Sequence, residues 1–266
     1  MPIRKVESKQ NAQLKELRQS LAAPRRAADG LVGIEGPKLL EEALRAGLRL
    51  SAVFVAQQAE QLLDGFALPP ETEVLLVPQK LLDSALTTEA PQPIAALAAP
   101  PEWGWSNLLA PHRKKPMLLV LAGLQDPGNL GTILRSAEAF GASGVVCLPG
   151  TVNPWNPKAV RASAGSVFRL PIIAAAITEC FARLHATKIK IFATAVREAK
   201  AAHRLDLTVP AAFLIGNEGN GLPAELARQA DAALTIPCPG PVESLNAAIA
   251  SSLLLYEAAR QRGGER

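Results

Sequence analysis

Two hydrophobic patterns alternate along the second half of the chain. Short continuous apolar runs predict buried strands, and stretches with apolar residues every three or four positions predict helices. The predicted strands span residues 117–122, 145–148, 189–194, 212–215 and 233–236, and the predicted helices span residues 130–140, 158–164, 179–185, 223–230 and 247–260. Strands that alternate with helices indicate an α/β fold with a mostly parallel sheet, in which ligands lie at the carboxyl ends of the strands.

The first hundred residues predict a smaller α/β unit. Its predicted helices span residues 11–22, 37–46 and 79–86, and its predicted strands span residues 31–34, 52–56 and 74–77. An edge strand is expected near Ile94, in a stretch rich in proline and alanine. Proline, glycine, tryptophan and a basic cluster then break the pattern in PEWGWSNLLAPHRKKP, residues 101–116. We therefore divide the chain into a first domain at residues 1–105, a linker at 106–116 and a second domain at 117–266.

The composition is that of a globular protein and disfavours several other classes. The 266 residues are 48% hydrophobic and 20% charged, no apolar run is long enough to span a bilayer, and the charged start lacks the apolar core of a signal peptide. We therefore expect a cytoplasmic protein without a membrane partner. Three widely separated cysteines predict free thiols, and three histidines without a metal-binding spacing predict that no metal is bound.

The net charge of +4 comes entirely from the first fifty residues, which hold ten Lys or Arg and six Asp or Glu. A basic start of this kind forms either a solvated helical face or a surface that contacts phosphates. The charge therefore permits a nucleic-acid partner without identifying one.

Three polar clusters lie at predicted strand ends in the second domain, at residues 123–141, 213–223 and 236–260. The first has the GxxxxG spacing of a phosphate loop, but Asn129 and Leu130 stand where an ATPase needs lysine and serine or threonine. The second, FLIGNEGNGLP, has three glycines, a composition common where backbone closely approaches a ligand. No GxGxxG motif is present and no GxSxG surrounds Ser244, so a nicotinamide-dependent enzyme and a hydrolase are both disfavoured.

The polar residues of these clusters also have ordinary structural explanations. Asn129 is predicted to be the N-cap of helix 130–140, and Arg135 is either a plain surface arginine or a functional one. Ser244 and Asn246 are good caps for the last predicted helix. That helix is apolar on every face, so we expect it to be buried within the domain or in a dimer interface.

Taken together, NLGTILRSAEAFG, FLIGNEGNGLP and IPCPGPVESLNAAIASSLLLYEAAR resemble the motifs of the SpoU, or TrmH, branch of the SPOUT RNA methyltransferases. The resemblance covers residues 117–260, and the intervening NPWNPKAVRASAGSVFRLPI is also similar to the family. It implies a parallel-sheet domain that binds S-adenosylmethionine in a deep trefoil knot, and a homodimer with its knots packed together. The first unit is similar in pattern to the small ribosomal-protein-like domain with which many members bind their substrate.

The resemblance also implies a site at which a ribose 2′-hydroxyl of RNA accepts a methyl group without a metal. By correspondence with the family, the catalytic residues are Asn129, Arg135, Glu218, Ser244 and Asn246. The cofactor-binding residues are Thr194, Ala195, Gly216, Ile236, Pro237 and Leu245.

Several of these implied residues have open roles. Arg135 is a general base in accounts of the family, but a guanidinium stays protonated, so binding the adjacent phosphate and stabilising the developing alkoxide is the role that we expect. It acts either in its own subunit or in the site of the other. Glu218 either orients Arg135 or balances the sulfonium charge. Gly216 and Gly219 are expected to let the backbone close around adenosine.

Three functions are therefore compatible with the sequence and the family resemblance. The first is an RNA ribose 2′-O-methyltransferase that acts on ribosomal RNA, either as a housekeeping or as an antibiotic-resistance enzyme. The second is the same enzyme class acting on transfer RNA, and the third is a non-catalytic RNA-binding or ribosome-assembly protein of the same fold. In each of them, residues 1–105 are expected to carry much of the affinity for RNA.

Overall fold

The computed structural model describes residues 2–22, 30–110, 115–195, 199–242 and 244–263. The chain forms two compact units, the first of Met1–Glu102 with Trp155–Phe168 and the second of Trp103–Pro154 with Arg169–Arg266. The contacts thus group the segment Trp155–Phe168 with the first unit, whereas the division drawn from the sequence keeps it in the second domain.

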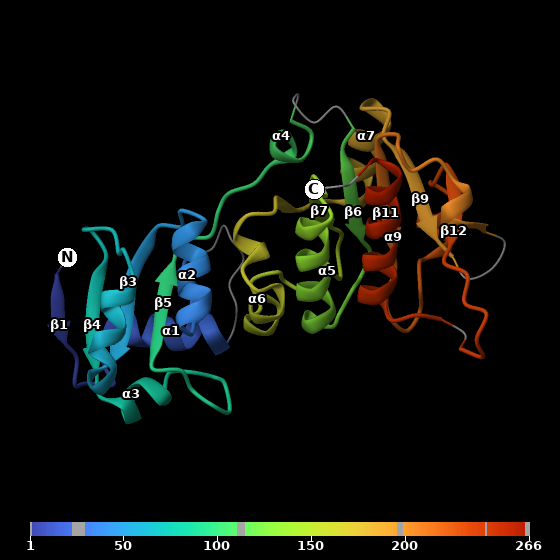
Figure 1. The fold of residues 1–266 in the computed structure, drawn as a ribbon. Helices are drawn as coiled ribbons and strands as arrows, with labels where there is room; N and C mark the ends of the chain where they lie inside the picture. Colours follow the sequence, from blue (N-terminus) through green and yellow to red (C-terminus); the bar gives the residue numbers. More distant parts are fainter. Residues whose placement is uncertain (1, 23–29, 111–114, 196–198, 243, 264–266) are drawn as a thin grey trace. The chain divides into compact units, whose positions relative to one another are not determined.

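A five-stranded mixed sheet forms the first unit, in the order β1-β4-β3-β5-β2 (Figure 1). Its strands are β1 (Ile3–Lys5), β2 (Val32–Glu35), β3 (Leu50–Ala56), β4 (Glu73–Val77) and β5 (Ile94–Ala98), and its helices are α1 (Ala12–Ala22), α2 (Pro37–Arg45), η2 (Gln57–Gly65), α3 (Gln79–Asp83), α6 (Pro157–Ser163) and η3 (Ser166–Phe168). Leu14 and Leu17 of α1 share a buried cluster with Phe54 and Leu75 of the sheet, so this unit has a core of its own.

The expectation of an edge strand near Ile94 is wrong. Strand β5 lies between β3 and β2, is antiparallel to both, and has all five residues buried. Pro91 and Pro93 precede the strand and Pro100 and Pro101 follow it, so none of them removes an N–H group from its ladders.

A seven-stranded sheet forms the second unit, in the order β10-β12-β9-β11-β6-β7-β8, with every pair parallel. Its strands are β6 (Met117–Leu121), β7 (Gly144–Cys147), β8 (Ile172–Ala174), β9 (Lys190–Thr194), β10 (Lys200–Ala201), β11 (Ala211–Ile215) and β12 (Ala232–Thr235), and its helices are α4 (Trp105–Leu108), α5 (Pro127–Ala139), α7 (Ile177–Ala186), η4 (Ala202–Arg204), α8 (Ala224–Ala227) and α9 (Ala247–Gln261). The predicted parallel sheet is confirmed, and the two strands that the pattern missed, β8 and β10, are the shortest.

The sheet is covered on both faces. Leu118, Val120 and Leu214 share one buried cluster with Phe181 and other residues of α7. Alternate strand residues point to the opposite face, where α5 and α9 lie side by side in Figure 1. These two helices contact each other through the Ser136 and Ser252 hydroxyls at 2.7 Å and through the edge-to-face rings of Phe140 and Tyr256.

The start of each of these two helices is set by its cap. Helix α5 begins at Pro127 with Asp126 as N-cap, whose carboxylate accepts the Asn129 N–H at 2.7 Å. The prediction that Asn129 is the N-cap is therefore wrong, because the Asp-Pro pair before it is the stronger start signal. Asn246 is the N-cap of α9 and accepts the N–H groups of Ala248 at 2.9 Å and Ile249 at 3.2 Å, which confirms that prediction.

Helix α9 is buried on only one side within this chain, and its expected burial in a dimer interface stays a prediction. Leu254, Leu255 and Ala258 are fully buried against the rest of the unit. Ile249 and Tyr256 are both 53% exposed and Leu253 is 42% exposed. With spacings of four and three residues, these three side chains form a single apolar stripe along the helix. Among the described residues, no helix is both long and apolar enough to cross a membrane.

The sheet order brings four loops together. Strands β12, β9, β11 and β6 are consecutive neighbours and run in the same direction. Their carboxyl ends therefore meet at one edge, where ligands bind in open α/β sheets. The stretches that leave these ends start at Ile236, Ala195, Gly216 and Ala122, and they supply the candidate site.

Candidate functional site

The turn that follows β11 is closed by its own backbone and by one asparagine. Asn217 and Gly221 exchange both backbone hydrogen bonds at 2.9 Å. The Asn217 side-chain oxygen accepts the N–H groups of Gly219 at 2.8 Å and Asn220 at 3.1 Å, and its amide nitrogen donates to the Gly123 carbonyl at 2.8 Å. Asn217 thus shapes the turn and ties it to the loop after β6.

Gly216 is required by the turn itself. A Cβ atom at this position would lie 2.3 Å from the Gly221 carbonyl carbon and 2.4 Å from the Leu222 nitrogen, both of them backbone atoms. A Cβ at Gly219 would meet only the Asn217 side-chain oxygen, at 3.5 Å, which is an ordinary contact. Gly216 therefore serves a close approach of the chain's own backbone, and Gly219 has no steric need to be glycine. That the two glycines let the backbone close around adenosine stays a prediction.

Glu218 points its carboxylate at the start of helix α5. It accepts the backbone N–H groups of Gln125 at 3.2 Å and Asp126 at 3.1 Å, and the Asn129 side-chain amide at 3.1 Å. Burial opposes the ionised form, but these hydrogen bonds outweigh it and hold the pKa of Glu218 below its ordinary value. The described contacts of Glu218 do not include Arg135, so they give no support to the expectation that it orients this arginine.

Asn129 links the turn to helix α9. Its amide nitrogen donates to Glu218, and its side-chain oxygen accepts the Asn246 amide at 3.0 Å. These two bonds fix which way the Asn129 amide faces. The chain of contacts Glu218–Asn129–Asn246 joins three elements that are far apart in sequence, and it brings together three of the five expected catalytic residues.

Arg135 and Ser244 stand apart from this chain of contacts. Arg135 lies on α5 and is exposed, and no hydrogen bond or ion pair joins it to another described residue. Ser244 is exposed in the loop before α9 and lines the cavity described next.

A cavity of about 570 Å³ opens among the three stretches that follow β9, β11 and β12, and the start of α9 also lines it. All six expected cofactor-binding residues line it, as do Glu218 and Ser244, whereas Asn129, Arg135 and Asn246 do not. Its other walls are mainly apolar, from Ile215, Leu234 and Leu254, and Glu218 carries the only charge among the described lining residues. A volume of this order suits one small organic molecule.

Three residues of the site were not singled out in the sequence. Asp126 caps α5 and Asn217 holds the turn, and an Asp-Pro pair and an Asn in a glycine-rich turn are signals that could have indicated both. Cys238 is exposed in the proline-rich loop and lines the cavity. No group of three or more His, Cys, Asp or Glu among the described residues is placed to hold a metal ion.

Comparison with known families and proteins gives consistent matches along the whole chain. The model of the SpoU rRNA Methylase family matches residues 116–256, and that of the MRM3-like substrate binding domain matches residues 11–96. The 23S rRNA (guanosine(2553)-2'-O)-methyltransferase RlmP of Bacillus subtilis is 31% identical over 254 residues, which cover 96% of this chain and 98% of that protein.

Two solved structures are similar to this chain over nearly its full length. The SpoU methyltransferase AviRb from Streptomyces viridochromogenes, in complex with the cofactor AdoMet, has a TM-score of 0.85 at 28% identity and covers 97% of this chain and 100% of its own. An AdoMet-bound rRNA methyltransferase from Sinorhizobium meliloti has a TM-score of 0.83 at 33% identity and covers 97% of this chain and 98% of its own.

Proposed function

The chain belongs to the SpoU rRNA methylase family, and on this premise we propose that it transfers the methyl group of S-adenosylmethionine to a ribose 2′-hydroxyl of ribosomal RNA. The ribosomal substrate is favoured because relatives matched over nearly their full length are named as ribosomal RNA enzymes. The match to a substrate-binding domain over residues 11–96 supports the expectation that the first unit contributes affinity for RNA.

The charge of the cavity is the main observation in favour of S-adenosylmethionine as the cofactor. Basic side chains favour a nucleotide with a phosphate chain, whereas the described residues that line this cavity include no basic side chain and one acidic side chain, Glu218. Apolar walls suit an adenine ring, and the carboxylate of Glu218 suits a cation. S-adenosylmethionine is a cationic adenosine derivative, and when bound it supplies a methyl group that its sulfonium already activates.

We assign the six cavity residues Thr194, Ala195, Gly216, Ile236, Pro237 and Leu245 to the cofactor. They come from the carboxyl ends of β9 and β11 and from the loop that joins β12 to α9, so one molecule would be held by all three segments at once. Glu218 contributes negative charge to the wall while its carboxylate stays hydrogen-bonded to the start of α5.

The remaining polar residues are assigned to RNA. Arg135 is exposed and without a described partner, and a guanidinium remains protonated, so it binds the phosphate next to the target ribose and stabilises the oxygen as negative charge develops on it. Asn129, oriented by Glu218 and Asn246, and Ser244, at the rim of the cavity, position the ribose.

We further propose that the protein is a homodimer whose knotted domains pack through the apolar stripe Ile249, Leu253 and Tyr256 on α9. A stripe of this kind on an otherwise packed helix is typical of a protein interface. The knot itself is proposed from the family resemblance, and the insertion of β12 between the earlier strands β9 and β10 is compatible with it. Leu253→Glu should therefore give a monomer in analytical ultracentrifugation, and a dimer with this substitution would contradict the assigned interface.

A homodimer would allow Arg135 to complete the site of the other subunit. Mixing Arg135→Ala chains with chains that cannot bind the cofactor tests this directly. Recovered activity in the mixed dimers supports action between subunits, and its absence places Arg135 in the site of its own chain.

The enzyme class is tested by incubating the protein with tritiated S-adenosylmethionine and total RNA from a strain that lacks it. Label on ribosomal RNA is expected, and Arg135→Ala should lower the rate by about 100- to 1,000-fold, the typical effect of removing one oxyanion-stabilising donor. Label on transfer RNA would support the second function instead. Cofactor binding without any RNA label, on assembling ribosomal particles as well, would support a non-catalytic protein.

A further inference from the structure

Thr151 is not among the residues that line the cavity, but its hydroxyl is bonded to the end of β6 and to the loop that follows it. Thr151 comes shortly after β7, and its hydroxyl donates to the Leu121 carbonyl at 2.9 Å and accepts the Gly123 N–H at 3.2 Å. Next to these bonds, the Val152 N–H donates to the Leu124 carbonyl at 2.8 Å. The stretch after β7 is thus fastened to the stretch after β6.

Gly123 makes hydrogen bonds in two directions. Its N–H faces Thr151, and its carbonyl accepts the Asn217 side-chain amide at 2.8 Å. This agrees with the sheet order, in which β6 lies between β7 and β11 (Figure 1). Asn217 in turn accepts the N–H groups of Gly219 and Asn220, and all three of these residues line the cavity. A continuous chain of hydrogen bonds therefore runs from Thr151 to the wall of the cavity.

Gly123 has no side chain whose packing could fix its orientation. Its φ is +76°, a conformation that glycine adopts without strain, and a Cβ at this position would meet nothing within 4 Å. The hydrogen bonds to Thr151 and Asn217 are therefore what orients this residue. A valine at position 151 could make neither of the two hydroxyl bonds, whereas a serine could make both.

We propose that Thr151 is a positioning residue for the cofactor. It holds Gly123 in the orientation in which the Gly123 carbonyl meets Asn217, and so keeps the turn after β11 in the shape that binds S-adenosylmethionine. Without the hydroxyl, Gly123 and the turn populate other arrangements, and the apparent affinity falls with the fraction of molecules that are competent to bind. The inference rests on the proposed function, because the bound molecule is the cofactor assigned there.

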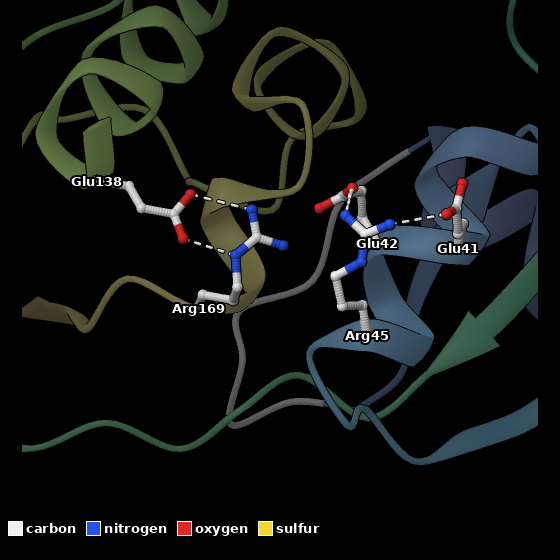
Figure 2. Close-up of polar contacts among 5 residues, drawn as sticks. All are labelled: Glu41, Glu42, Arg45, Glu138 and Arg169. Carbon is white, nitrogen blue, oxygen red and sulfur yellow. Dashed lines mark hydrogen bonds and ion pairs between the residues drawn. The ribbon is translucent and has the colours of Figure 1, made fainter. Parts of the chain in front are cut away.

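A second contact provides a matched control. The chain leaves the second unit after Pro154, shortly after Thr151, and returns to it at Arg169. At the return, the Glu138 carboxylate accepts the Arg169 Nε at 2.6 Å and Nη2 at 3.0 Å (Figure 2). Glu138→Gln therefore weakens an anchor of the same excursion of the chain without touching the hydrogen bonds that lead to the cavity.

Isothermal titration calorimetry of the full-length chain with S-adenosylmethionine tests the proposal. Thr151→Val should weaken binding by about three- to tenfold, the effect of losing one hydrogen bond of ordinary strength. Thr151→Ser should bind about as tightly as the wild type because it keeps the hydroxyl, and Glu138→Gln should do so because it leaves the turn alone. Equal losses in Thr151→Val and Thr151→Ser, or in Thr151→Val and Glu138→Gln, would overturn the proposal.

A double-mutant cycle tests the route through Gly123. Asn217→Asp keeps a side-chain oxygen for the N–H groups of Gly219 and Asn220, but it cannot donate to the Gly123 carbonyl. The added charge acts on the cofactor with either residue at position 151, so its effect cancels from the cycle. In this background Thr151→Val should have little further effect. An undiminished loss of affinity there would refute the route.

Thermal unfolding without cofactor shows whether each variant folds. If Thr151→Val does not, Thr151→Ala replaces it, because the smaller side chain leaves room for water beside both backbone groups, and its affinity should again lie below that of Thr151→Ser. A wild-type protein that does not bind S-adenosylmethionine would refute the proposed function together with this inference. A wild type that binds it, beside a folded Thr151→Val of equal affinity, refutes only the role of Thr151.

Discussion

The cavity that we assign to the cofactor depends on a close backbone contact at Gly216, which one added methyl group would disturb. In Gly216→Ala the new Cβ would lie 2.3 Å from the Gly221 carbonyl carbon, and ordinary contacts begin at 3.4 Å. The backbone at Gly216 or the turn opposite must therefore move by about 1 Å, because neither atom belongs to a side chain that can rotate away. Overpacking of this kind typically costs about 1–3 kcal/mol. If this strain falls on the cavity, cofactor affinity drops by about 5- to 150-fold.

Gly219→Ala is the matched control in the same turn. Its Cβ would meet only a side-chain oxygen at 3.5 Å, so cofactor affinity should stay close to that of the wild type. Isothermal titration calorimetry with S-adenosylmethionine measures both variants, and thermal unfolding without cofactor shows whether each one folds. Equal affinities for Gly216→Ala and the wild type, or equal losses in the two variants, would refute the reasoning.

Three further predictions concern other residues of the site. Hydrogen bonds lower the pKa of Glu218 in the folded protein, so its ionised form stabilises the fold at pH values above its ordinary pKa of 4.5, and this contribution disappears as the pH falls. Urea unfolding should show Glu218→Gln less stable than the wild type at pH 7, with the difference shrinking below about pH 4. N-ethylmaleimide should label Cys238 selectively, because Cys238 is exposed whereas burial raises the pKa of both Cys147 and Cys180 to about 12. S-adenosylmethionine should block this labelling, because Cys238 lines the cavity. Labelling at an unchanged rate with cofactor present would place the cofactor elsewhere. Asn246→Ala should lower the free energy of unfolding by about 1 kcal/mol, because the helix cap is lost. Asn246→Asp should keep the cap but lose activity, because it lacks the amide donor. An active Asn246→Asp would contradict the positioning role.

The parallel sheet and the place of the site were accessible from sequence patterns. Continuous runs such as Met117–Leu121 and Ala211–Ile215 are typical of strands buried on both faces, and both form neighbouring strands at the centre of the sheet. The residues assigned to the cofactor by family resemblance all line the same cavity. Five of them lie at or just after the carboxyl ends of β9, β11 and β12, which share one edge of the sheet, and Leu245 lies just before α9.

What sequence patterns missed depends on contacts between distant residues. No local pattern indicates that Gly216 must be glycine because of backbone five residues later, or that Glu218 turns its carboxylate toward α5. The apolar composition of α9 could not separate its buried face from the exposed stripe at Ile249 and Leu253, because periodicity is lost when nearly every position is small or apolar. The pairing of Glu138 with Arg169 likewise appears only when the chain is folded.

The position of the transferred methyl group tests the central claim most directly. Ribosomal RNA labelled by the protein from tritiated S-adenosylmethionine is hydrolysed completely in alkali, and the products are separated by size. Alkaline cleavage needs a free 2′-hydroxyl, so a methyl group on that oxygen leaves the label in a dinucleotide. The account predicts tritium in alkali-resistant dinucleotides. Tritium in mononucleotides would mean that a base is methylated, and it would contradict the proposed reaction.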